Sequence, residues 1–105
     1  MTSRLRILVA SEPKRIVVCL DADPRLAAAA GGAVRNLAES AGMSEEVCRE
    51  FQEATVRATL QVFESHNSGR HIIEFLRFED RVEVIIDSNA GSAAIHLARP
   101  VASHP

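Results

Sequence analysis

The stretch DADPRLAAAAGGAVRNLAESAGMSEE, residues 21–46, carries the start and stop signals of two helices. Asp23 directly precedes Pro24, so a capping carboxylate is followed by the residue that fits best at the first helical position. Gly42 is typical of a helix end, and Ser44 then offers a hydroxyl to free backbone amides, with two glutamates behind it at the positive end of the dipole. The stretch therefore predicts one helix from Pro24 to near Gly42 and a second that begins after Ser44.

Both predicted helices are amphipathic. Apolar residues of the first recur at helical spacing: Leu26, Ala30, Ala33, Val34, Leu37 and Ala41. One face of the second carries Val47, Phe51, Ala54, Ala58 and Val62, and the opposite face, which we interpret as solvated, carries Glu46, Glu50, Glu53, Arg57 and Glu64. Gly31 and Gly32 lie inside the first helix, where each costs about 1 kcal/mol relative to alanine, so we expect a close backbone approach or a local kink.

Segments with the two-residue period of β-strands flank these helices. The predicted strands are residues 5–9, 16–20, 71–78, 81–87 and 93–101. Pro100, near the end of the last segment, indicates an edge strand. The order β-β-α-α-β-β-β predicts an α+β fold. We expect a two-layer α/β sandwich, in which two helices cover one face of a mixed, mostly antiparallel sheet of about five strands, as a single domain over residues 1–105.

The composition of the chain argues against two classes of binding partner, nucleic acids and membranes. The 105 residues carry a formal charge of −2, the pI is near 6.1, and the aromatic residues are four Phe without Trp or Tyr. Without a basic excess or aromatic stacking platforms, we expect no nucleic-acid partner. No apolar run is long enough for a membrane span, so we expect no membrane contact and a cytoplasmic location.

Cysteines and histidines do not form a recognisable metal motif. Cys19 and Cys48 lack the close spacing of a zinc site, and we interpret both as buried thiols. The spacing of the four histidines fits no recurrent ligand pattern, so no metal site is expected. They are His66, His71, His96 and His104.

Four features between Ile16 and Gly91 carry a resemblance to a known family. First, a strand leads through DADPRL into a helix that ends in ESAGMSEE, as in that family, where a small helix-to-helix turn precedes the motif helix. QEATVRAT, residues 52–59, stands where the family has an SEAxTNA-like box. HIIEFLRFEDRVEVIID, residues 71–87, looks like the paired strands that follow, and DSNAG, residues 87–91, stands where the family has DxGxG. The chain resembles the ATP-binding domain of the gyrase, histidine-kinase and MutL (GHKL) superfamily, most closely the bacterial anti-sigma-factor serine kinases.

The resemblance implies roles for particular residues. The general-base glutamate of the family matches Glu53, and the aspartate that accepts a hydrogen bond from adenine matches Asp87. The asparagine that binds Mg²⁺ matches Arg57, whose guanidinium has no acceptor atom and cannot ligate a cation. The first glycine of DxGxG is Asn89 here, and Gly91 remains. Only 14 residues follow Gly91, so we expect the ATP lid and the second glycine-rich box to be absent.

Glu53 and Arg57 can also be interpreted without any ligand. Four residues apart on one helix, in the favourable order, they predict a surface ion pair worth about 0.3–0.5 kcal/mol. The functional interpretation is that Arg57 neutralises a ligand phosphate in place of the metal.

Three functional hypotheses follow. The favoured one is a non-catalytic regulatory protein-interaction domain, resembling an anti-sigma-factor kinase that has lost ATP and Mg²⁺ binding, with a sigma factor or an anti-sigma antagonist as the implied partner and no cofactor. The second is a minimal ATP-binding protein or serine kinase. The third is an unrelated small α/β interaction domain. The edges of a short sheet must be covered, and a homodimer is one arrangement that would cover them.

Overall fold

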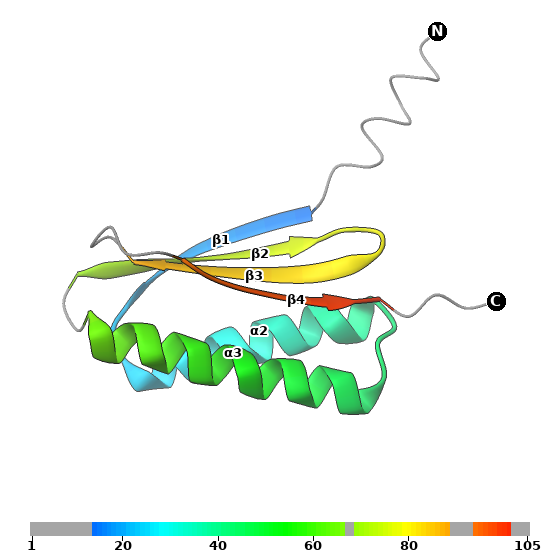
Figure 1. Cartoon of the computed structure of the whole chain (residues 1–105), viewed down its shortest axis with the longest axis horizontal. Coiled ribbons are helices and arrows are strands. Elements are labelled where there is room, and N and C mark those ends of the chain that lie inside the picture. Colours follow the sequence, from blue (N-terminus) through cyan, green and yellow to red (C-terminus); the bar gives the residue numbers. More distant parts are fainter. Residues whose placement is uncertain (1–13, 67–68, 89–93, 102–105) are drawn as a thin grey trace, which may run out of the picture.

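The computed structural model describes residues 14–66, 69–88 and 94–101. Its elements are β1 Lys14–Asp21, α2 Pro24–Ser40, α3 Glu45–Ser65, β2 Arg70–Arg77, β3 Arg81–Ser88 and β4 Ile95–Pro100. Figure 1 shows two layers, with both helices on one face of the sheet. The predicted α+β class is confirmed.

The described sheet has four strands in the order β1-β2-β3-β4, and every neighbouring pair is antiparallel. The prediction of about five strands in a mixed sheet therefore differs from what these residues form, since one helical hairpin and then short turns connect strands that alternate in direction. The predicted strand at residues 5–9 lies outside the described residues.

Local signals set the helix boundaries as the sequence predicts. The carboxylate of Asp23 accepts a hydrogen bond from the Arg25 backbone N–H at 3.0 Å, and Pro24 occupies the first turn of α2. The Ser44 hydroxyl accepts from the Val47 backbone N–H at 3.2 Å. Gly42 adopts a φ of 83°, a conformation that glycine reaches without strain, and this lets the chain reverse between the helices.

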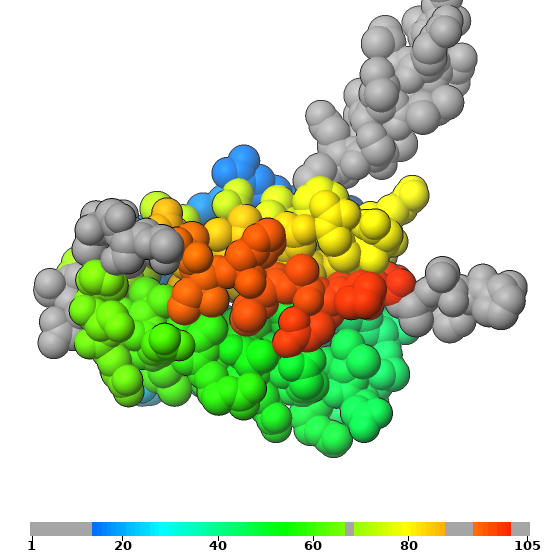
Figure 2. All heavy atoms as spheres, in the orientation of Figure 1, coloured from blue at the N-terminus to red at the C-terminus, as the bar shows by residue number. Residues whose placement is uncertain are grey.

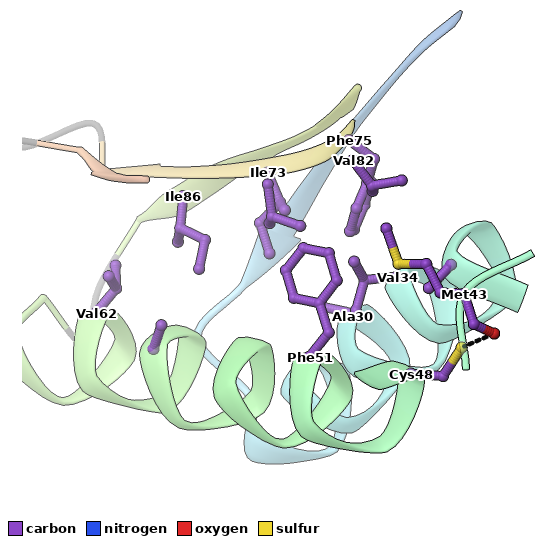
Figure 3. Close-up of a cluster of buried hydrophobic side chains, with 13 residues drawn as sticks. Ala30, Val34, Met43, Cys48, Phe51, Val62, Ile73, Phe75, Val82 and Ile86 are labelled. Carbon is purple, nitrogen blue, oxygen red and sulfur yellow. Dashed lines mark hydrogen bonds between the residues drawn. The ribbon is translucent and has the colours of Figure 1, made fainter. Parts of the chain in front are cut away.

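The core lies between the helices and the inner face of β2 and β3. Alternate residues of these strands, Ile73, Phe75, Val82, Val84 and Ile86, are buried against α2 and α3. Figure 3 shows the Phe51 ring of α3 pointing up into this cluster. The predicted apolar face of α3 is thus confirmed at Phe51, Ala58 and Val62, which are all buried.

The two helices lie close together at Gly31. A Cβ atom at this position would lie 2.4 Å from Cγ2 of Val56 and 3.2 Å from the carbonyl oxygen of Gln52. At Gly32 an added Cβ would meet nothing within 4 Å. Of the two outcomes predicted for the glycine pair, the close backbone approach is confirmed, and Gly31 alone provides it.

The two thiols differ in burial. Cys48 is fully buried, and its Sγ lies 3.6 Å from the Met43 carbonyl oxygen. Cys19 is exposed, so the prediction that both thiols are buried is wrong for Cys19. The reason is the alternation of β1: Val18 and Leu20 point toward the helices, and Cys19 between them points to the opposite face of the sheet.

One buried polar residue stands out. The His71 side chain is 1% exposed, and neither ring nitrogen has a hydrogen-bond partner within the described residues. Its ring packs against Phe63 of α3 with 5.2 Å between centroids. His71 is therefore an apolar-packed residue at the end of the sheet.

Candidate functional site

The residues that the sequence predicts as functional on α3 line an open depression on the outer surface of the helical layer. Its volume is about 530 Å³. It is lined by Arg35 of α2 and by Arg49, Gln52, Glu53, Val56 and Arg57 of α3. We call this surface the arginine depression. It faces away from the sheet, because the opposite side of α3 carries the buried Phe51, Ala58 and Val62.

Arg35 forms one wall of the arginine depression and ties the two helices together. Its Nε donates to Glu39 at 3.1 Å along α2, and its Nη1 donates to the Gln52 amide oxygen at 3.0 Å across to α3. Its Nη2 also pairs with the Glu45 carboxylate at the start of α3. The hydrogen bonds that Arg35 donates to Glu39 and Glu45 raise the pKa of its guanidinium above the ordinary value. This guanidinium is therefore already balanced by carboxylates.

Arg49 and Arg57 differ from Arg35, because no ion pair of the described residues includes either of them. In particular, Glu53 and Arg57 do not pair, so the predicted i,i+4 ion pair is wrong. Both side chains are exposed, where such a pair gains too little free energy to hold two long side chains in one geometry. The depression thus offers two guanidinium groups that have no ion pair among the described residues, beside the Glu53 carboxylate.

A different ion pair connects the neighbouring side of α3 to β4. Arg99 of β4 donates from Nε and Nη2 to the two carboxylate oxygens of Glu50, at 2.8 and 2.7 Å. The hydrogen bond from Arg99, and to a smaller extent the charge of Arg57, hold the pKa of Glu50 below its usual value. Figure 2 shows β4 lying directly against α3 on this side of the molecule.

Asp87, the predicted adenine-binding residue, does not line the arginine depression and lies on another layer of the molecule. It is exposed at the end of β3, where Val82, Val84 and Ile86 point inward to the helices. By the alternation of a strand, Asp87 points to the outer face of the sheet. Glu53 points outward from the helical layer, so the core of the sandwich lies between the two carboxylates.

The predicted site residues are therefore only partly brought together. Glu53 and Arg57 share the arginine depression, Asp87 is on the other outer surface, and Asn89 and Gly91 lie outside the described residues. Within residues 14–66, 69–88 and 94–101, no group of three or more His, Cys, Asp or Glu side chains is arranged to hold a metal ion.

Sequence reasoning missed Arg35, Arg49 and Gln52. Arg49, Gln52, Glu53 and Val56 follow the i, i+3, i+4, i+7 spacing of one helical stripe, and this signal was present in the sequence. The placement of Arg35 against that stripe depends on how α2 packs on α3 around Gly31, which no local pattern specifies.

Neither the protein-family models nor the curated proteins compared with this chain give a match. In the part of the chain that the structure describes, neither helix combines the length and the apolar composition needed to cross a membrane.

Proposed function

We propose that this chain is a non-catalytic, regulatory protein-interaction domain that binds a protein partner through the arginine depression. The observation that supports this most is the separation of Glu53 from Asp87 by the core of the sandwich. A nucleotide site of the type that the resemblance implies would need both carboxylates around one ligand. The described residues instead present an exposed helical surface.

The chemistry of the arginine depression indicates the kind of partner surface that it fits. Arg49 and Arg57 have no ion pair of their own among the described residues, and the guanidinium group is suited to two-pronged hydrogen bonding with carboxylates. Arg35 is held rigidly by Glu39, Glu45 and Gln52, so one wall of the surface is ordered before binding. An acidic segment of a protein is the complementary partner. A sigma factor or an anti-sigma antagonist is the class that the sequence resemblance implies, and a cytoplasmic location is part of this proposal.

Binding of purified sigma factors and anti-sigma antagonists from the source organism, measured by biolayer interferometry, tests the proposal. We expect one of them to bind the unmodified chain. We expect the double variant Arg49→Glu, Arg57→Glu to weaken this binding at least about 100-fold, since close charge pairs across an interface couple by about 1.5–7 kcal/mol and the substitutions turn attraction into repulsion. Arg70→Glu is the matched control, because Arg70 is an exposed arginine on β2 outside the depression. Equal loss of binding in the control, or no binding by any member of the two classes, contradicts the proposal.

A minimal ATP-binding protein or serine kinase is the second candidate function, and one observation favours it. Arg49 and Arg57, which have no ion pair among the described residues, lie beside Glu53 in one depression, where they could neutralise phosphate oxygens. This function requires ATP binding, and if adenine contacts Asp87 it requires that Asp87→Asn abolish that binding.

A further inference from the structure

β1 is an edge strand that the other described strands leave open on one side. In the described sheet its only neighbour is β2. The other edge strand, β4, ends in Pro100, which has no backbone N–H to offer a further strand. β1 contains no proline, and the large apolar side chains that are exposed in the described residues lie on β1 or on β2: Ile16 at 49%, Val17 at 52% and Ile72 at 37%. Such an edge is a site at which another strand can add.

The register of the sheet shows which residues of β1 direct their backbone groups to the open edge. The Phe78 N–H donates to the Arg81 carbonyl at 2.9 Å, so the hydrogen-bonded pairs between β2 and β3 fall on the even-numbered residues of β2. The odd-numbered residues of β2 therefore direct their backbone groups to β1, where their partners are the even-numbered residues from Lys14 to Leu20. The residues of β1 whose backbone groups point outward are the odd-numbered ones, Arg15, Val17, Cys19 and Asp21.

An apolar groove runs on the helical side of this edge. It has a volume of about 110 Å³ and is lined by Val18, Leu20, Ala29, Ala30, Ala33 and Phe75. α2 packs against β2 and β3, and Figure 1 shows the start of β1 rising away from the helical layer, so the side chain of Ile16 is left exposed. Apolar side chains of a further strand beside β1 would lie along this groove.

We propose that β1 pairs with β1 of a second copy of this chain, antiparallel about a two-fold axis, so that the two sheets join into one. The inference does not rest on the proposed function. Opposite residues of an antiparallel pair share one face of the sheet, so both helical layers lie on the same side of the joined sheet. β2 and its copy are then three strand spacings apart, about 14 Å. This distance leaves room for both copies of α2, because packed helices lie about 8–10 Å apart.

Side-chain chemistry selects one register among those in which the outward residues form the hydrogen-bonded pairs. With the axis between the two copies of Val18, the residues that lie opposite one another match in character: Arg15 with Asp21, Val17 with Cys19, and Ile16 with Leu20. An axis at Val17 would instead place Arg15 opposite Cys19. An axis at Cys19 would place Val17 opposite Asp21. β1 is thus self-complementary in one register, and a two-fold interface requires a self-complementary surface, so the structure favours a second copy over an unrelated segment.

Arg15 and Asp21 are accessible to each other's copies across this interface. Their side chains are 63% and 79% exposed. Arg15 pairs with Glu74 of β2 through Nε, so its remaining guanidinium nitrogens can donate to a second carboxylate. The ion pair of Asp21 within the described residues is a distant one, with 4.0 Å between its carboxylate and the Arg70 guanidinium. The two-fold axis repeats the pair of Arg15 with Asp21, so two charge pairs flank the apolar centre of the interface.

Sedimentation velocity of the full chain over a range of concentrations, with two charge variants, tests the proposal. We expect the unmodified chain to show a monomer–dimer equilibrium. Arg15→Asp and Asp21→Arg each set like charges opposite one another twice, so each should weaken dimerisation at least about tenfold. Mixing the two variants should restore the dimer, because every changed residue then faces an opposite charge.

The matched control is Glu46→Arg, which makes the same charge change as Asp21→Arg at an exposed position of α3, the helix that packs against β3 and β4. This variant should dimerise like the unmodified chain. A monomer up to the highest soluble concentration overturns the proposal. A mixture of the two charge variants that dimerises no better than each variant alone also overturns it.

A disulfide trap tests the register independently. Val17 of one copy lies opposite Cys19 of the other in a hydrogen-bonded pair, where the Cα atoms are about 5.5 Å apart, within the range of a disulfide. Val17→Cys should therefore give a disulfide-linked dimer under oxidised glutathione. The two copies of Cys19 lie diagonally, about 7–8 Å apart and beyond that range, so the unmodified chain is the control and should not be cross-linked. Cross-linking of the unmodified chain, or none in Val17→Cys, contradicts the proposed register.

Discussion

Replacing Gly31 by alanine tests the helix packing that forms the arginine depression. The added Cβ would lie 2.4 Å from Cγ2 of Val56 and 3.2 Å from the Gln52 carbonyl oxygen, on the opposite helix. Gly32→Ala is a matched control, because the neighbouring position is also inside α2 but has nothing within 4 Å of an added Cβ.

Both substitutions make the same favourable contribution to the free energy of unfolding, and Gly31→Ala alone also makes an unfavourable one. Each removes a glycine from a helix interior, which stabilises the helix by about 0.8–1.0 kcal/mol. At Gly31 the packed helices must also move apart or Val56 must leave its preferred rotamer, and overpacking of this kind costs about 1–3 kcal/mol. We therefore expect Gly32→Ala to be stabilised by close to 1 kcal/mol, and Gly31→Ala to be less stable than Gly32→Ala by about 1–3 kcal/mol.

Thermal and urea unfolding of both variants measure this difference. For a domain of this size, each kcal/mol shifts the midpoint by roughly 4–8 °C. Adding Val56→Ala to Gly31→Ala should recover part of the loss in a double-mutant cycle, because the closest contact is with the Val56 methyl group. Equal stability of Gly31→Ala and Gly32→Ala would refute the close approach of α2 and α3, and with it the position of Arg35 against Gln52.

Three further predictions concern the core and titratable groups. Phe51→Ala should lower the unfolding free energy by about 3–5 kcal/mol, because the ring is fully buried; an unchanged urea midpoint would contradict this. Glu50→Gln should cost at most about 1 kcal/mol at pH 7, since the Glu50 side chain is half exposed. Because Arg99 lowers the pKa of Glu50, the stability from this pair is present above the ordinary carboxyl pKa near 4.5 and is lost as the pH falls through the lower folded-state pKa. The unfolding free energies of the wild type and of Glu50→Gln should therefore converge in acid. Burial raises the pKa of the Cys48 thiol above its ordinary value of 9.0, so the stability that the neutral buried thiol contributes is fully present below pH 9.0 and is lost as the pH rises through the folded-state pKa. In urea unfolding, the free energy of unfolding of Cys48→Ala should therefore fall less steeply with pH in alkali than that of the wild type. Parallel pH dependences of the two proteins would contradict this prediction.

Local chemistry made the helices predictable from the sequence. Asp23, Ser44 and Gly42 act at their own positions, so their roles could be inferred before any tertiary contact was known. The same holds for Phe51, because helical periodicity alone places it on the core face of α3. The alternation of β1 also placed Cys19 on the outer face, and the general tendency of free cysteines to be buried misled the prediction.

The remaining features depend on contacts between residues far apart in the chain. Arg99 is 49 positions from Glu50, and Arg35 is 17 positions from Gln52, so neither pair leaves a local pattern. The predicted pairing of Glu53 with Arg57 rested on spacing only, and spacing does not include the competition from solvent at an exposed surface. Motif matching likewise put Glu53 and Asp87 into one site, whereas the layer order puts them on opposite outer surfaces.

A calorimetric titration with ATP, with and without Mg²⁺, tests the proposed loss of nucleotide binding most directly. The proposed function predicts no saturable heat under either condition, and the same titration with inorganic triphosphate controls for attraction of phosphate to Arg49 and Arg57 alone. Saturable ATP binding that requires Mg²⁺ and disappears in Asp87→Asn would contradict the proposal and would establish a nucleotide site.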